Sequence, residues 1–151
     1  MLENCKTAKE RWGGVSAIID RWLQERQDLL VRYCELSTDE DPSVAAPHLQ
    51  GLCQILVDYV SAGHFEVYDQ LIREGQEFGD DEALKKASEL FKHIDSTTEV
   101  ALDFNDKYLE TDDLTDLQTD LSNIGEVLES RFAAEDQMIS VLHVAHKDMV
   151  A

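Results

Sequence analysis

The sequence predicts an all-α protein, an antiparallel helical bundle with a four-helix core and short extra helices, in a single domain over residues 1–151. Apolar residues recur at three- and four-residue steps along most of the chain, and no stretch shows the strict alternation of a half-buried strand. With two prolines and seven glycines in 151 residues, few positions interrupt a helix. At 43% hydrophobic residues, the chain has enough apolar side chains to build a core.

The first helix is expected from a capping box at residues 7–10, Thr-Ala-Lys-Glu, to about Leu36. Its apolar face repeats at helical spacing through Trp12, Val15, Ile18, Ile19, Trp22, Leu29, Leu30 and Tyr33. A polar stretch at residues 37–47 follows, with an acidic run and both prolines. This composition predicts a flexible loop.

The second helix is expected at about residues 49–74, ending at Gly75 or Gly79. Asp80 and Asp81 are positioned to cap a third helical segment. The run Ser-Thr-Thr-Glu at residues 96–99 resembles a capping box and predicts a break before a fourth segment. The last helix is expected from about Leu114. Antiparallel packing of these segments is the architecture that short connections favour.

The charge of the chain excludes several classes of partner. Thirteen Lys and Arg against 32 Asp and Glu give a formal net charge of −19. Such a surface repels phosphate backbones and anionic lipids, so direct binding to nucleic acid or to membranes is not expected. The expected partner, if there is one, is basic.

No feature of the sequence predicts a secreted, membrane or catalytic protein. The first ten residues lack an apolar signal region and no stretch has 18 consecutive apolar residues, so a cytoplasmic protein is expected. The three cysteines have no C-x-x-C spacing, and none of the 15 Glu has His three residues later, so no metal site is expected. His143 and His146 are interpreted as surface or seam residues. Phosphate loops and nucleophile motifs are absent, so neither an enzyme nor a cofactor is expected.

Polar residues interrupt two of the apolar faces. Arg26 lies on the first helix between Trp22 and Leu29, and Arg131 and Glu135 lie on the apolar face of the last helix. An internal or half-buried ion-pair network that fixes helix register is the structural interpretation. The alternative is a polar cavity or partner-binding crevice at the end of the bundle.

A second stripe lies on the second helix, about 130° from its apolar seam when projected at about 100° per residue. Its members combine an acid, a hydroxyl, two aromatics and an aliphatic side chain: Asp58, Ser61, Phe65, Tyr68 and Ile72. A central helix that packs on two neighbours would show such a stripe. A binding surface would also show it, because aromatic anchors beside a carboxylate are common at interfaces.

At these residues the sequence resembles the Rsd/AlgQ family, bacterial regulators that bind the primary sigma factor of RNA polymerase. The similarity runs from Leu2 to about His146, and the block at residues 56–65 is long enough to make a chance match improbable. Residues 11–15, 20–26 and 78–80 are more similar to the alginate-regulator branch than to the regulator-of-sigma-D branch. The matching segments are residues 20–23 with Arg26, Leu30 and Tyr33; residues 56–65 with Tyr68; residues 124–128; and residues 131–136 with Ile139.

The resemblance implies a non-enzymatic anti-sigma activity. Members bind region 4 of the sigma-70-type factor, a basic helix-turn-helix domain that reads the −35 element and docks on core polymerase. Carried over by position, the implied contact residues are Asp58, Ser61 and Phe65, followed by His64 and Tyr68. Asp20, Arg26, Arg131 and Glu135 also lie in matching motifs, but their seam positions favour a structural role.

Two other classes of function remain open at this point. One is a metal- or small-ligand-binding bundle that uses Arg26, His64, Arg131 and Glu135 around a cavity. The other is an adaptor that modulates a different regulatory protein, which an acidic surface also permits.

Overall fold

The computed structural model describes residues 15–38, 42–110 and 113–144, and these are helical apart from short turns. The capping box expected at residues 7–10 lies outside the described residues, as does His146. The α-helices and two π-helical turns are, in chain order, α2 (Val15–Thr38), α3 (Pro42–Ala62), η2 (Gly63–Val67), α4 (Tyr68–Glu77), α5 (Asp81–Glu110), α6 (Leu117–Ile139) and η3 (Ser140–Val144).

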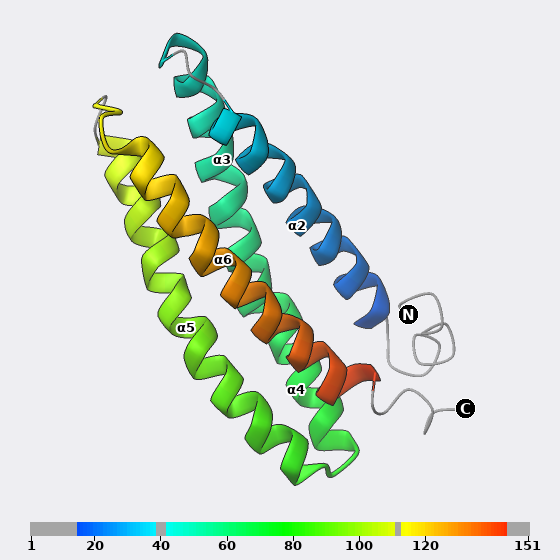
Figure 1. Ribbon diagram of the computed structural model, residues 1–151. Coiled ribbons are helices and arrows are strands. Elements are labelled where there is room, and N and C mark those ends of the chain that lie inside the picture. Colours follow the sequence, from blue (N-terminus) through cyan, green and yellow to red (C-terminus); the bar gives the residue numbers. More distant parts are fainter. Residues whose placement is uncertain (1–14, 39–41, 111–112, 145–151) are drawn as a thin grey trace.

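The helices form the predicted all-α antiparallel bundle (Figure 1). α3, η2 and α4 follow one another as one long element, which runs antiparallel to both α2 and α5. α2 packs on α3, α3 on α5, and α5 on α6. This order places α2 and α6 at the two ends of a series of packed neighbours.

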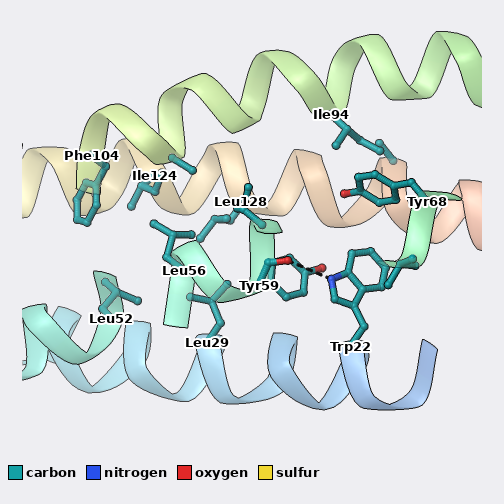
Figure 2. Close-up of a cluster of buried hydrophobic side chains, with 14 of the residues drawn as sticks. Trp22, Leu29, Leu52, Leu56, Tyr59, Tyr68, Ile94, Phe104, Ile124 and Leu128 are labelled. Carbon is teal, nitrogen blue, oxygen red and sulfur yellow. Dashed lines mark hydrogen bonds between the residues drawn. The ribbon is translucent and has the colours of Figure 1, made fainter. Parts of the chain in front are cut away.

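The apolar faces predicted for the helices meet in one core. Trp22 of α2 stacks on Tyr59 of α3 with ring centroids 5.1 Å apart, and its indole N–H donates to the Tyr59 carbonyl at 3.3 Å (Figure 2). Leucines and isoleucines of the other helices continue the core toward Phe104. Burial of this surface is the main driving force of folding.

The loop predicted at residues 37–47 is wrong over most of its length. α2 continues to Thr38 and α3 begins at Pro42, so six of those residues are helical at the start of α3. Proline suits the first turn of a helix, because its fixed φ is helical and its missing N–H has no acceptor there. Pro47 lies inside α3, within its second turn.

The break predicted at Ser96 is also wrong, since α5 is continuous from Asp81 to Glu110. The Ser96 hydroxyl donates to the His93 carbonyl at 2.7 Å, and the Thr97 hydroxyl donates to the Ile94 carbonyl at 2.6 Å. Hydroxyl side chains in mid-helix can bond to the preceding turn in this way without capping anything.

The expected cap of the third segment is confirmed at Asp80. Its Oδ1 accepts from the Ala83 backbone N–H at 3.1 Å, and α5 starts at the next residue. The preceding helix ends at Glu77, and Gly79 takes a positive φ of 64°. Of the two predicted ends, Gly79 is therefore the correct one.

Candidate functional site

The outward face of α3 carries the first residues predicted to contact a partner. Asp58 is exposed and Ser61 is half-buried, whereas Leu56 and Val60 of the same helix are buried in the core. The Gln54 side chain donates to Asp58 Oδ1 at 3.3 Å, one helical turn earlier. Asp58 therefore presents its carboxylate at the surface.

A second helix adds carboxylates to this face. Burial raises the pKa of Glu25 on α2, and the nearby carboxylates of Glu66 and Asp58 raise it further. Glu25 Oε2 is buried and accepts no hydrogen bond from the described residues. Arg21 lies 3.9 Å from Glu66, and both side chains are largely exposed. We call Glu25, Asp58, Ser61 and Glu66 the Asp58 surface.

Tyr68 does not belong to this surface, which corrects its predicted place on the stripe. The prediction assumed about 100° per residue throughout the helix. The π-helical turn η2 places more residues in one turn, which rotates everything after it relative to α3. Tyr68 consequently points inward and is 2% exposed.

Gly63, the first residue of η2, permits this inward turn. A Cβ atom added there would lie 3.0 Å from the Tyr68 hydroxyl oxygen and 3.3 Å from the Trp22 ring. The close approach of both rings therefore requires the absence of a side chain at residue 63. His64 and Phe65 also belong to η2, but their side chains lie outside the described part of the structure.

Three residues predicted to form a polar network do meet in the interior, around the Glu135 carboxylate. Glu135 Oε1 accepts from the Tyr59 hydroxyl at 2.5 Å and from Arg26 at 3.4 Å. Glu135 Oε2 accepts from the Tyr68 hydroxyl at 2.6 Å and from Arg131 Nε at 3.2 Å. We call this group the Glu135 network; its members are Arg26, Tyr59, Tyr68, Arg131 and Glu135.

The remaining nitrogens of Arg131 tie the network to α5 and to α4. Nη1 donates to the hydroxyls of Thr97 and Thr98 at 3.1 and 2.7 Å, and Nη2 donates to the Tyr68 hydroxyl at 2.9 Å. Neither Arg131 nor Glu135 is exposed to solvent. The network thus links α2, α3, α4, α5 and α6, which fits the structural interpretation of these residues.

Arg26 lies at the edge of the Glu135 network. Its Nη1 donates to Asp136 at 2.7 Å, and its guanidinium lies 4.7 Å from the Phe132 ring centroid. Asp20, which was predicted with this group, is instead exposed on α2, so the structure does not bring it into the network.

The ionisation of the network follows from its burial. Burial raises the pKa of Glu135, while Arg131 and the two tyrosine hydroxyls act in the opposite direction. Burial, together with the Glu135 charge, also raises the pKa of Tyr59 and of Tyr68. Both tyrosines therefore remain protonated donors at neutral pH. These polar groups bond to one another, so the network needs no ligand to be satisfied.

Sequence reasoning missed several members of these two groups. Tyr59, Thr97 and Glu25 are polar residues whose role depends on a neighbouring helix, and a single helical projection carries no signal for that. A buried pair at the end of the bundle was missed for the same reason: His143 Nδ1 lies 2.8 Å from Glu74 Oε2, and both side chains are buried.

Two further properties concern metals and membranes. Among the residues that the structure describes, no group of three or more His, Cys, Asp or Glu side chains is arranged to hold a metal ion. None of the described helices combines the length and apolar character needed to cross a bilayer.

Comparisons with known proteins give a consistent result. The sequence model of a family described as "Regulator of RNA polymerase sigma(70) subunit, Rsd/AlgQ" matches residues 1–143. A "Regulator of sigma D" from Enterobacter sp. (strain 638) is 34% identical, with 100% of this chain and 98% of that protein covered. Proteins of the same name from Yersinia pseudotuberculosis and Yersinia enterocolitica are 34% and 32% identical over 92% of this chain and 87% and 88% of theirs.

Proposed function

Because this chain belongs to the Rsd/AlgQ family of regulators of the RNA polymerase sigma(70) subunit, we propose that it is an anti-sigma factor. In this proposal it binds region 4 of the primary sigma factor and holds that domain away from core polymerase and from the −35 element. Transcription then shifts toward other sigma factors. The activity takes place in the cytoplasm, where the polymerase works, and involves no chemical step.

The observation that supports this proposal is the Asp58 surface. Burial raises the pKa of Glu25 on α2, the carboxylates of Glu66 and Asp58 raise it further, and Arg21 offsets them in part. Carboxylates held together repel one another, and a cation from a partner relieves that repulsion. Region 4, as the family resemblance describes it, is a basic domain. The surface is therefore complementary in charge to the proposed partner.

The proposed mechanism is competition for the same basic side chains. Lys and Arg residues that contact DNA phosphates at the −35 element are the groups that carboxylates attract. A complex that pairs them with the Asp58 surface makes them inaccessible to DNA. The body of the bundle then also blocks the approach of core polymerase.

Alanine substitutions at two predicted contact residues test the proposal. We expect Asp58→Ala and Phe65→Ala each to weaken binding of purified sigma region 4 by about 1–3 kcal/mol in a calorimetric titration. Circular dichroism should show that both variants remain folded. Asp95→Ala, which removes an exposed carboxylate from α5, is the matched control and should bind like the wild type.

The outcome separates the surface assignment from the function. If both variants bind region 4 as tightly as the wild type, the contact surface lies elsewhere. If the wild type does not bind region 4 at all, the anti-sigma function is wrong. A pull-down with tagged protein would then test the adaptor alternative, which predicts a main partner other than the primary sigma factor.

A further inference from the structure

An apolar groove runs between α2 and α6, and none of its lining residues belongs to the Asp58 surface. The packing order places these two helices at opposite ends of a series of neighbours, and Figure 1 shows them antiparallel with α3 behind. The groove has a volume of about 470 Å³. It is lined by Leu30, Tyr33, Gly125, Leu128, Glu129, Phe132, Ala133 and Asp136.

Contacts at both ends hold the groove open. At one end the Tyr33 hydroxyl donates to the Leu121 carbonyl at 2.8 Å, which fixes the distance between the helices. A Cβ atom at Gly125 would collide with the Tyr33 ring, so the glycine allows this crossing. At the other end Arg26 bonds to Asp136 at 2.7 Å. The groove therefore does not have to form when a ligand arrives.

The floor of the groove is apolar and accessible. Leu30 is 36% exposed. Tyr33 and Phe132 are half-buried, and Ala133 is exposed. Lining residues extend from Gly125 to Asp136 on α6, a length of about 16 Å at 1.5 Å per residue. This length matches about three turns of a helix laid along the groove.

The charges around the groove decide which helix fits. Glu129 supplies an exposed carboxylate to its wall, whereas Asp136 and the guanidinium of Arg26 are bonded to one another at 2.7 Å. Arg32 of α2 points to another side, where it lies against Gly51 of α3. A second copy of this chain, with a net charge of −19, would bring like charges together.

We propose that this groove binds an amphipathic helix of a second protein, with apolar side chains toward the floor and Lys or Arg toward Glu129. This inference goes beyond the anti-sigma function, because no residue of the Asp58 surface lines the groove. In this proposal the protein holds region 4 at the Asp58 surface and a basic helix in the groove.

A designed peptide tests the groove directly. The probe is a fluorescent, helical Lys/Leu peptide of about 14 residues, with Leu at i, i+4 and i+7 along one face. A scrambled Lys/Leu peptide of the same composition controls for general attraction to an acidic protein. A Glu/Leu peptide with the same apolar face controls for the charge. We expect the amphipathic Lys/Leu peptide to bind at least about tenfold more tightly than either control.

Matched variants locate the binding. Leu30→Ser and Glu129→Lys should each weaken binding of the Lys/Leu peptide by about tenfold. Leu102→Ser, at a leucine that is 41% exposed on α5, and Glu99→Lys, also exposed on α5, should change it less than about twofold. In NMR spectra, the peptide should shift the backbone amide signals of Gly125 and Ala133.

Several results would overturn the proposal. Equal binding of the amphipathic and scrambled peptides would show that the groove does not specifically recognise an amphipathic helix. A dimer seen by sedimentation and abolished by Leu30→Ser would make the second copy the occupant. Weaker binding of sigma region 4 by Leu30→Ser would assign the groove to the sigma site, whereas unchanged sigma binding is expected. Failure of region 4 to bind the wild type would refute the proposed anti-sigma function, but it would not refute peptide binding in the groove.

Discussion

Arg131 and Glu135 carry opposite charges in a part of the interior where neither side chain is exposed. Their mutual attraction and their hydrogen bonds offset the cost of removing both charges from water. The arrangement is balanced only while every member is present. Loss of one partner leaves a buried charge without compensation, which costs more than the pair contributes.

We therefore expect Glu135→Ala to lower the free energy of unfolding by about 3–5 kcal/mol, because Arg131 would remain buried without a counter-ion. Urea unfolding followed by circular dichroism measures the change. Glu129→Ala, which removes an exposed carboxylate from the same helix, should change the free energy of unfolding by less than about 0.5 kcal/mol. Similar values for the two variants would contradict the structural role of the network.

Tyr68 allows the structural and partner-binding roles to be separated at a single atom. Its hydroxyl donates to Glu135 and accepts from Arg131. We expect Tyr68→Phe to lower the free energy of unfolding by about 1–3 kcal/mol, since the substitution leaves buried polar groups unsatisfied. The affinity of the folded variant for sigma region 4, measured by titration, should remain that of the wild type. A loss of affinity for sigma region 4 without a loss of stability would show that Tyr68 contacts the partner.

At the scale of the elements, regular patterns predicted most of the helices but not their irregular points. The spacing of Ile19, Trp22 and Leu29 identified buried positions of α2 correctly, although Leu30 of the same predicted face is 36% exposed. The π-helical turn η2 has no local signature that helical periodicity detects, so Tyr68, which follows it, was predicted on the outer stripe although it is buried. The hydroxyls of Ser96 and Thr97 fit both a cap and a mid-helix position, and the packing of Arg131 selects the second.

The junction of α5 and α6 depends on a carboxylate near the surface. Lys107 and Tyr108 of α5 donate to Asp120 of α6 at 2.6 and 2.5 Å. Hydrogen bonds from Lys107, and then from Tyr108, lower the pKa of Asp120. A lowered pKa in the folded state contributes stability above the unfolded-state pKa of about 3.9, and that contribution is lost as the pH falls through the folded-state pKa.

Asp120→Asn tests this junction. At pH 7 the variant should unfold at a lower urea concentration than the wild type, because it lacks the charged acceptor. The difference should shrink as the pH falls to about 3 and below, where the wild-type carboxyl is protonated as well. Asp95→Asn, at an exposed position on α5, controls for the removal of one negative charge. A difference that does not change with pH would show that the Asp120 charge is not what stabilises the junction.

For the molecule as a whole, composition and motif similarity predicted the fold class and the family, whereas the three-dimensional grouping of charges required the structure. The sequence predicted Asp58 as a contact residue, but not that Glu25 of α2 would lie beside it. It placed Arg26 and Arg131 on apolar faces, but it did not show that both would bond to the Glu135 carboxylate. Contacts between helices depend on packing, and residue spacing within one helix does not specify them.

The net charge of −19 makes a prediction about the kinetics of sigma binding. Long-range attraction between an acidic bundle and a basic domain accelerates their encounter, and dissolved salt screens it over about 10 Å at 0.1 M. We expect the association rate constant, measured by stopped-flow fluorescence, to fall by about tenfold or more between about 50 and 300 mM salt. The dissociation rate constant should change much less, because it depends on the contacts within the complex. Phe65→Ala should raise the dissociation rate constant and leave the salt dependence of association as it is. If salt leaves the association rate constant unchanged, the acidic surface does not guide the partner to its site, and its charge serves the solubility of the protein alone.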